Sequence, residues 1–182
     1  MVRSFGRAAR AALAAALFCA APHARTEEEP PPTEWEVKAA YLYNFTRYVE
    51  WPESALKPGT PFVVAVFGRD PFGGALDAAL AGKTVGTRPI EIRRLDRAEK
   101  AAFAHVLFVS SSERDAASAL RAVQGLPVLT VADADGLPPS PIVRFRVVDR
   151  RVRFDVNLAK AELARLKISS HLLRLALSVE GR

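Results

Sequence analysis

The chain has 182 residues, of which 49% are hydrophobic and 25% are charged. This composition is that of an ordinary globular protein, and it excludes a disordered, collagen-like or coiled-coil chain. The formal net charge of +6 falls to +3 when an N-terminal leader with three arginines is removed, and so small a positive excess gives no reason to expect a nucleic-acid partner.

The chain begins with a segment typical of a secretory signal peptide. Three arginines within the first ten residues precede an apolar run from Ala11 to Ala21, which is shorter than the roughly 20 residues that span a bilayer. We expect residues 1–24 to be the signal peptide, with cleavage after Ala24. The sequence therefore predicts a periplasmic protein without direct membrane insertion.

Mass spectrometry of the exported protein tests this prediction, and we expect a mature N-terminus at Arg25. The only cysteine, Cys19, lies in the leader, so the mature chain has no thiol for disulfides, metal binding or catalysis. Lipoprotein processing at Cys19 would need a small residue before it, and Phe18 stands there. A lipid-bearing N-terminus at Cys19 would contradict the prediction.

A flexible Glu- and Pro-rich tether over residues 25–33 precedes one expected α/β domain over residues 34–182. Thr33 and Glu36 form the capping-box pattern, which predicts a helix that starts at Glu34. Its apolar stripe consists of Val37, Tyr41, Leu42, Phe45, Tyr48 and Val49. Its polar face consists of Lys38, Asn44 and Arg47. We predict that Tyr41, Phe45, Tyr48 and Trp51 act mainly in folding, since such a stripe usually belongs to a core.

Four segments are predicted to form strands. Phe62–Phe67 and His105–Val109 are apolar without interruption, which is typical of parallel strands buried on both faces. Ile90 and Ile92 alternate with charged residues, which indicates a strand nearer an edge of the sheet. Pro127–Val131 is a further short apolar strand.

Helices are expected between these strands. Asp70 predicts the start of one helix, which Gly82 closes, and Ser110 with Glu113 predicts the start of another, which Gly125 closes. The alternation of helices and strands predicts an α/β fold: a mostly parallel sheet flanked by helices on both faces.

The C-terminal part predicts an antiparallel hairpin followed by terminal helices. Ile142–Val148 and Arg151–Val156 flank a two-residue turn at Asp149 and Arg150. Folding about this turn pairs Val147 with Val152, Phe145 with Phe154 and Val143 with Val156 on one face, and Arg146 with Arg153 and Arg144 with Asp155 on the other. Asn157 is expected to cap a helix that runs through Leu166. Ser169 is expected to cap a last helix that includes Val179.

Arg146 lies opposite Arg153, and this like-charge pair lowers the stability of the fold unless a negative charge nearby compensates it. One interpretation is that the repulsion is relieved by solvent, by a nearby glutamate or by packing of the arginine stems on apolar surface. The other is that this face docks an acidic partner or a small anion.

The sequence shows no recognisable active site. The loop Gly68–Gly74 lacks the Lys and Ser or Thr of a phosphate loop, no Gly-x-Ser-x-Gly elbow surrounds Ser110, and residues 133–136 are one ligand short of a calcium loop and read as a turn. We interpret His105 as structural. We therefore predict no enzyme, no metal and no cofactor, with a hydrolase that uses His171 as the third hypothesis.

Three motifs resemble one known family. Residues 39–52 (AAYLYNFTRYVEWP), 152–157 (VRFDVN) and 166–175 (LKISSHLLRL), in this order and behind a signal peptide, closely resemble the YfiR family of small periplasmic proteins. The resemblance covers about residues 34–180. It implies a regulator without catalytic residues that binds the periplasmic sensor domain of an inner-membrane diguanylate cyclase and represses cyclic-di-GMP synthesis, which lowers biofilm formation.

This sequence departs from the family pattern in two places. The cysteine pairs that form disulfides in the best-known members are absent, so their redox control is not expected here. Pro138-Pro-Ser-Pro141 stands where the family usually carries glycine.

The first hypothesis is therefore a repressor that contacts a cyclase, and a homodimer is compatible with it. We assign the candidate partner-binding residues from charge and expected exposure, not from the resemblance. They are Asn44, Arg47, Arg144, Arg146 and Arg153. The alternative from another class is a periplasmic module that binds a small anion and serves a sensor kinase or an uptake system.

Overall fold

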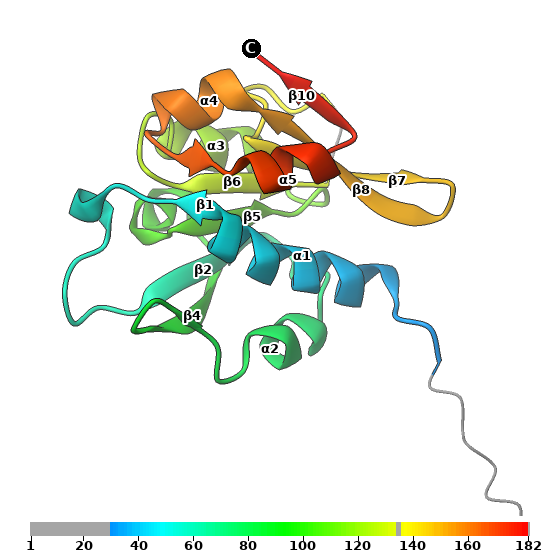
Figure 1. Ribbon diagram of the computed structural model, residues 1–182, viewed down its shortest axis with the longest axis horizontal. Coiled ribbons are helices and arrows are strands. Elements are labelled where there is room, and N and C mark those ends of the chain that lie inside the picture. Colours follow the sequence, from blue (N-terminus) through cyan, green and yellow to red (C-terminus); the bar gives the residue numbers. More distant parts are fainter. Residues whose placement is uncertain (1–29, 134–135, 182) are drawn as a thin grey trace, which may run out of the picture. The chain divides into compact units, whose positions relative to one another are not determined.

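Figure 1 shows the computed structural model, which describes residues 30–133 and 136–181. The chain divides into two units, Met1–Pro31 and Pro32–Arg182, and the second holds the helices and strands of the described residues. The predicted signal peptide lies outside the described residues. Among the helices that are described, none is both long and apolar enough to cross a membrane.

An eight-stranded mixed sheet forms the centre of the second unit, with the strand order β10-β8-β7-β6-β5-β2-β4-β3. Strands β4, β2, β5, β6 and β7 run parallel to one another, whereas β8 is antiparallel to β7 and β3 to β4. The strands are β2 (Phe62–Phe67), β3 (Thr84–Val85), β4 (Arg88–Leu95), β5 (Val106–Val109), β6 (Leu129–Ala132), β7 (Val143–Val148), β8 (Arg151–Asn157) and β10 (Ser178–Glu180). A small antiparallel sheet joins β1 (Val49–Glu50) to β9 (Lys167–Ile168). The predicted α/β class and the mostly parallel sheet are confirmed.

Helices cover both faces of the sheet and enclose two cores. The α-helices are α1 (Glu34–Tyr48), α2 (Ala75–Leu80), α3 (Ala116–Ala122), α4 (Leu158–Leu163) and α5 (Ser170–Leu175), and the 3₁₀ helices are η1 (Glu53–Ala55) and η2 (Ala98–Phe103). Alternate residues of the fully buried strand β2 enter different cores: Val64 lies with α1, α2 and α5, and Ala65 lies with η2 and α3. Side-chain alternation in a strand that is buried on both faces produces this division.

Helix α1 begins where the sequence predicts. The Thr33 side chain accepts a hydrogen bond from the N–H of Glu36, and the Glu36 carboxylate accepts one from the N–H of Thr33 at 2.6 Å. Phe45 is fully buried and Trp51 nearly so, while Tyr41 and Tyr48 are half-buried. These aromatic side chains pack on the core that α1 shares with the sheet.

Lys38 was predicted on the exposed face of α1, and this prediction is wrong. Its side chain is 3% exposed. Its Nζ lies 2.6 Å from a carboxylate oxygen of Glu34 and 3.5 Å from one of Asp133, and 4.1 Å from the centroid of the Trp35 ring. Two carboxylates and an aromatic face together compensate for the loss of water around the ammonium group.

The helices after β2 and β5 start later than predicted. Gly73 has φ +57°, a conformation that interrupts a right-handed helix, so α2 begins at Ala75. The Asp70 carboxylate instead accepts a hydrogen bond from the N–H of Phe72 at 2.8 Å and pairs with Arg94 at 2.7 Å. Ser110 bonds with Ser112, and the N-cap of α3 is Asp115.

The last two helices are shorter than predicted. Asn157 and Ser169 act as N-caps, as expected. Helix α4 ends at Leu163, because Arg165 has φ +56° and residues 167–168 then pair with β1. Helix α5 ends at Leu175, and Val179 belongs to strand β10, which pairs in parallel with β8. Strand β3 was not predicted.

The β7–β8 hairpin forms in the predicted register. Val147 pairs with Val152, Phe145 with Phe154 and Arg146 with Arg153. Asp149 and Arg150 have φ values of +50° and +59°, the signs that a type I′ turn requires at both central positions. The turn therefore forms although the second residue is arginine rather than glycine.

His105 is buried and ties the start of β5 to its neighbours, in agreement with a structural role. Its Nδ1 accepts a hydrogen bond from the N–H of Val63 at 3.0 Å, and its Nε2 lies 3.1 Å from the carbonyl oxygen of Ala55. The ring stacks on Phe62 with 4.5 Å between centroids. Because Nδ1 accepts, the neutral ring carries its proton on Nε2 and donates to Ala55. Burial of the ring, which the hydrogen bond to Ala55 opposes, lowers the pKa of His105.

This geometry predicts that the free energy of unfolding falls as the pH drops below about 6.5, the ordinary pKa of histidine. As the pH falls, His105 is protonated in the unfolded chain before it is protonated in the folded chain. The free energy of unfolding therefore has its full value above about pH 6.5 and decreases as the pH falls from there to the pKa of the folded state. Urea unfolding at pH 7 and pH 5 measures the loss. We expect His105→Gln to remove it and His171→Gln, a change at an exposed position, to retain it. An equal loss in the His105→Gln variant would refute this prediction.

Candidate functional site

Three of the candidate residues lie together on one face of the hairpin, which we call the arginine face: Arg144, Arg146 and Arg153. They share this face with Asp155, whose side chain is buried. Arg144 donates from Nη2 to the Asp155 carboxylate at 2.9 Å, Arg146 Nη1 lies 3.5 Å from the same oxygen, and the Ser178 hydroxyl donates to the other oxygen at 2.7 Å. Asp155 is thus the centre of this face.

The predicted pairing of Arg144 with Asp155 is confirmed. Asp155 also faces Arg146, a contact that the sequence did not predict. Burial alone would raise the pKa of Asp155, but hydrogen bonds from Ser178 and Arg144 outweigh burial, and the pKa is lowered. Asp155 therefore stays ionised and reduces the repulsion between Arg146 and Arg153. Arg153 itself is exposed, and within the described part of the chain no carboxylate pairs with it.

Asn44 and Arg47 lie apart from the arginine face. Helix α1 packs on the opposite face of the hairpin, where the Tyr41 ring lies 5.4 Å from that of Phe154, measured between centroids. Asn44 is half-buried on α1 and Arg47 is exposed near its end. The structure therefore divides the five candidate residues between two sides of the sheet, so one flat partner surface cannot contact all of them.

The structure adds an exposed apolar surface that the sequence reasoning did not identify, and we call it the apolar ledge. Two of its members lie on the outer half of the hairpin, one is the last residue of α5, and one directly precedes β10. They are Val147, Leu175 and Leu177, which are exposed, and Val152, which is half-buried. Val147 is 53% exposed and the two leucines are 49% exposed. The N–H of Leu177 donates to the carbonyl oxygen of Phe154 at 2.7 Å, which keeps the segment before β10 beside β8.

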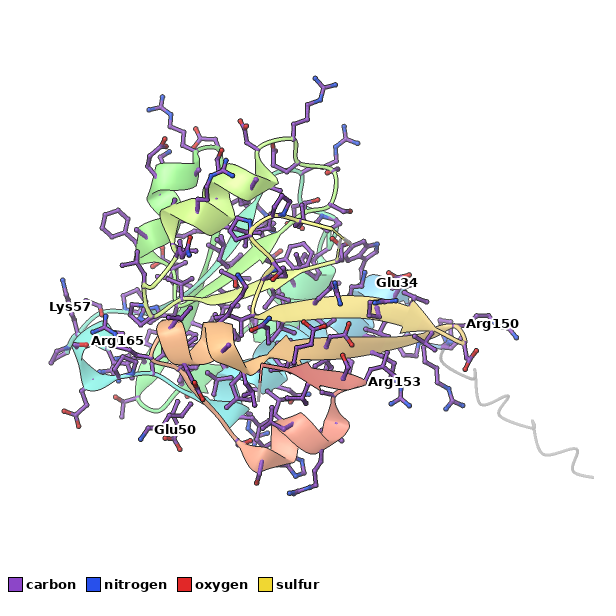
Figure 2. The ribbon with its side chains drawn as sticks, turned by 90° about the horizontal axis from the view of Figure 1, so that it is seen from above. Glu34, Glu50, Lys57, Arg150, Arg153 and Arg165 are labelled. Atoms are coloured by element: carbon purple, nitrogen blue, oxygen red, sulfur yellow. The ribbon has the colours of Figure 1, made fainter. Side chains whose placement is uncertain are left out.

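A groove runs beside the ledge, between the start of α1 and the tip of the hairpin. It has a volume of about 270 Å³, and Val37, Val147 and Val152 form its apolar part. Arg150, Arg151 and Glu34, whose carboxylate pairs with Lys38, also line it. Figure 2 shows Arg150 at the tip of the hairpin, with Arg153 further along it. Exposed apolar side chains bordered by arginines are typical of a protein-docking surface.

Many parallel sheets bind small ligands at the carboxyl ends of two adjacent strands whose following helices lie on opposite faces of the sheet. In this protein β2 and β5 are such a pair of strands. In this protein the side chains of the chain itself fill that place. A Cβ atom on Gly68 would lie 2.7 Å from the Cβ of Glu113, and the Asp133 carboxylate accepts a hydrogen bond from the N–H of Ser111 at 3.1 Å. The two carboxylates disfavour an anion at this position.

Polar clusters elsewhere give no metal centre within residues 30–133 and 136–181, where no three His, Cys, Asp or Glu side chains gather in a way that could hold an ion. Part of the acidic turn at residues 133–136 lies outside the described residues. His171, the histidine of the third hypothesis, is exposed, and its ring lies 4.9 Å from that of Tyr48.

Comparison with known protein families gives one match that covers most of the chain. A family model described as YfiR/HmsC-like matches residues 35–177, a range that includes α1, the parallel strands, the hairpin and α5. The comparison with curated proteins gave no match. The matched range contains the three motifs at residues 39–52, 152–157 and 166–175, together with the arginine face and the apolar ledge.

Proposed function

We propose, because the chain belongs to the YfiR/HmsC-like family, that it is a periplasmic regulator that represses a membrane diguanylate cyclase. The family match carries this proposal, since it supports a regulatory rather than an enzymatic protein. The proposed partner is the periplasmic sensor domain of the cyclase, and the proposed consequence is a lower level of cyclic-di-GMP and less biofilm.

A protein that acts without catalysis must repress by differential binding. It binds the inactive conformation of the cyclase more tightly than the active one, and the difference in affinity sets the shift between the two populations. Repression then depends on a docking surface that is formed before the partner arrives. The type I′ turn and the Asp155 cluster support the hairpin as this surface, because they fix its geometry without a partner.

We propose the outer half of the hairpin, residues 146–153, as the principal contact. One of its faces presents Val147 and Val152 from the apolar ledge, and the other presents Arg146 and Arg153. A partner that encloses the tip contacts both faces, although α1 lies on only one side. Asn44 and Arg47 are contacts only for a partner that also extends along α1.

Charge favours an acidic partner surface at this tip. Arg150, Arg151 and Arg153 are exposed, and arginines at the border of an interface increase association rates and select partners of opposite charge. The interaction is therefore expected to weaken with added salt, since exposed charges are screened over about 10 Å at 0.1 M ionic strength.

Isothermal titration calorimetry tests the proposal. The mature chain is titrated into the isolated periplasmic domain of a diguanylate cyclase encoded in the same genome, at low and high salt. We expect saturable binding that weakens with salt. If none of these domains binds, and phosphate or another small anion alone raises the melting temperature of the chain, the result overturns the proposal in favour of the anion-binding module.

A further inference from the structure

A second groove lies at the other end of the parallel strands, beside the amino ends of β2, β5 and β6. It has a volume of about 410 Å³, within the range of roughly 300 to 1,000 Å³ that is usual for binding sites. Loop residues 54–61, the end of η2 and the segment before β6 form its walls. Figure 2 shows Lys57, which lines this groove, at the opposite end of the domain from Arg150 at the hairpin tip. The groove is therefore separate from the proposed cyclase-binding surface.

One wall of this groove carries an exposed aromatic side chain. Phe103, the last residue of η2, is 73% exposed, the largest exposure among the large hydrophobic residues that the structure describes. Pro127, which is half-buried, and Val128, which is 2% exposed, line the groove with it, and Val128 also lines a neighbouring hollow beside Leu163, which is 66% exposed. Solvent-exposed aromatic rings next to a concave surface are common anchors for a partner chain.

The charged lining of the groove is cationic. Among the described residues that line it, Lys57 and Arg93 are basic and none carries a carboxylate. Arg93 already pairs with Glu91 at 2.7 Å, outside the lining. Lys57 has no such pair within the described part of the chain, so its ammonium group is the charge that a bound group would meet. The nitrogens of His105 are both used, by Val63 and Ala55.

The aromatic ring and the ammonium group of this groove together favour one type of ligand. A second copy of the chain in a two-fold dimer would bring two Lys57 side chains to one interface, which like-charge repulsion disfavours. A carboxylate next to an apolar or aromatic side chain satisfies both parts of the groove: the carboxylate meets Lys57, and the apolar group covers Phe103 and the exposed part of Pro127.

We propose that the groove is a second docking site, which binds a peptide segment of another protein in which an acidic residue neighbours an aromatic one. This site acts independently of the hairpin tip, because the groove lies at the amino ends of the parallel strands and the tip follows the carboxyl end of β7. The inference does not depend on the identity of the cyclase, and its test requires only the chain itself.

Nuclear magnetic resonance titration of the ¹⁵N-labelled mature chain tests the proposal with two matched peptides. The probes are acetyl-Gly-Phe-Asp-Gly-amide and acetyl-Gly-Phe-Asn-Gly-amide, which differ only in the charged group. We expect saturable shifts at residues 54–61 and 102–105, with the aspartate peptide binding roughly tenfold more tightly. Lys57→Gln should remove this preference, and Phe103→Ala should weaken both peptides. The control Lys100→Gln should change neither, because Lys100 is an exposed lysine on η2 that pairs with Asp96.

Three results would overturn the proposal. The first is equal affinity for the two peptides, and the second is a set of shifts at the hairpin rather than at the groove. The third is an absence of shifts up to about 5 mM peptide, which is weaker than a useful docking site. Sedimentation of the unliganded chain completes the test, since a dimer that Phe103→Ala dissociates would assign the groove to a second copy instead.

Discussion

Phe45→Ala should lower the free energy of unfolding by about 3 to 5 kcal/mol, the usual cost of removing a fully buried aromatic ring. Phe45 is fully buried, and its ring lies 5.8 Å from that of Phe145 and 5.2 Å from that of Phe154. The substitution removes two of the ring contacts that join α1 to the inner half of the hairpin, while those of Tyr41 remain. In a domain of this size the melting temperature should fall by about 10 °C or more, as differential scanning calorimetry can measure.

Phe103→Ala is the matched control for this prediction. It removes the same ring from a position that is 73% exposed, so the melting temperature should change little. If Phe45→Ala leaves the melting temperature unchanged and abolishes binding of the cyclase domain instead, the aromatic stripe of α1 is an interface and the assignment to the core is wrong.

Two single substitutions at the outer hairpin, Val147→Glu and Arg153→Glu, should each raise cyclic-di-GMP towards the level of a strain without the protein. The first places a charge on the apolar ledge and the second reverses a charge on the arginine face, so either change weakens a partner that encloses the tip. Both side chains are exposed, so the folded chain should remain abundant. Mass spectrometry of extracted nucleotides measures the effect.

Arg153 is a better probe of the arginine face than Arg146. Arg146 lies 3.5 Å from the Asp155 carboxylate, so a glutamate there would disturb the buried cluster as well as the surface. Lys167→Glu is the control, because it makes the same change of charge at an exposed position on β9. Full repression by the Arg153→Glu and Val147→Glu variants would show that the hairpin is not the contact surface.

The local parts of this fold could be read from the sequence because short-range patterns determine them. The hairpin register follows from the alternation of apolar and charged residues on both sides of Asp149 and Arg150, and its pairs agree with the structure throughout. The start of α1 follows from the capping box of Thr33 and Glu36. In both cases the residues that decide the structure are only a few positions apart.

Other parts could not be predicted because they depend on distant contacts. The local sequence indicates that Lys38 is a surface lysine. In the folded protein its ammonium group lies 3.5 Å from the carboxylate of Asp133, a residue that is far away in the sequence. Strand β10 follows α5 without a helix-breaking residue before Val179, and only its pairing with β8 makes it a strand. Conversely, the late start of α2 follows from the backbone conformation of Gly73, which the sequence permits but does not dictate.

The candidate site shows the same division. The pairing of Arg146 with Arg153 was predicted, whereas the role of Asp155 as a shared partner of Arg144 and Arg146 was not. The apolar ledge was missed because its exposure depends on how much of the hairpin α1 and α5 cover. Val147 and Val152 were correctly placed on one face with Phe145. The alternation of apolar and polar residues, however, does not show how far along the hairpin the helices cover this face.

The most direct test of the proposed repressor is the level of cyclic-di-GMP in four strains: wild type, a deletion of this protein, a deletion of the partner cyclase, and both deletions together. Repression by contact predicts that loss of the protein raises cyclic-di-GMP when the cyclase is present and has no effect when the cyclase is absent. An unchanged level after deletion in the strain that retains the cyclase, or an equal rise in both backgrounds, would contradict it.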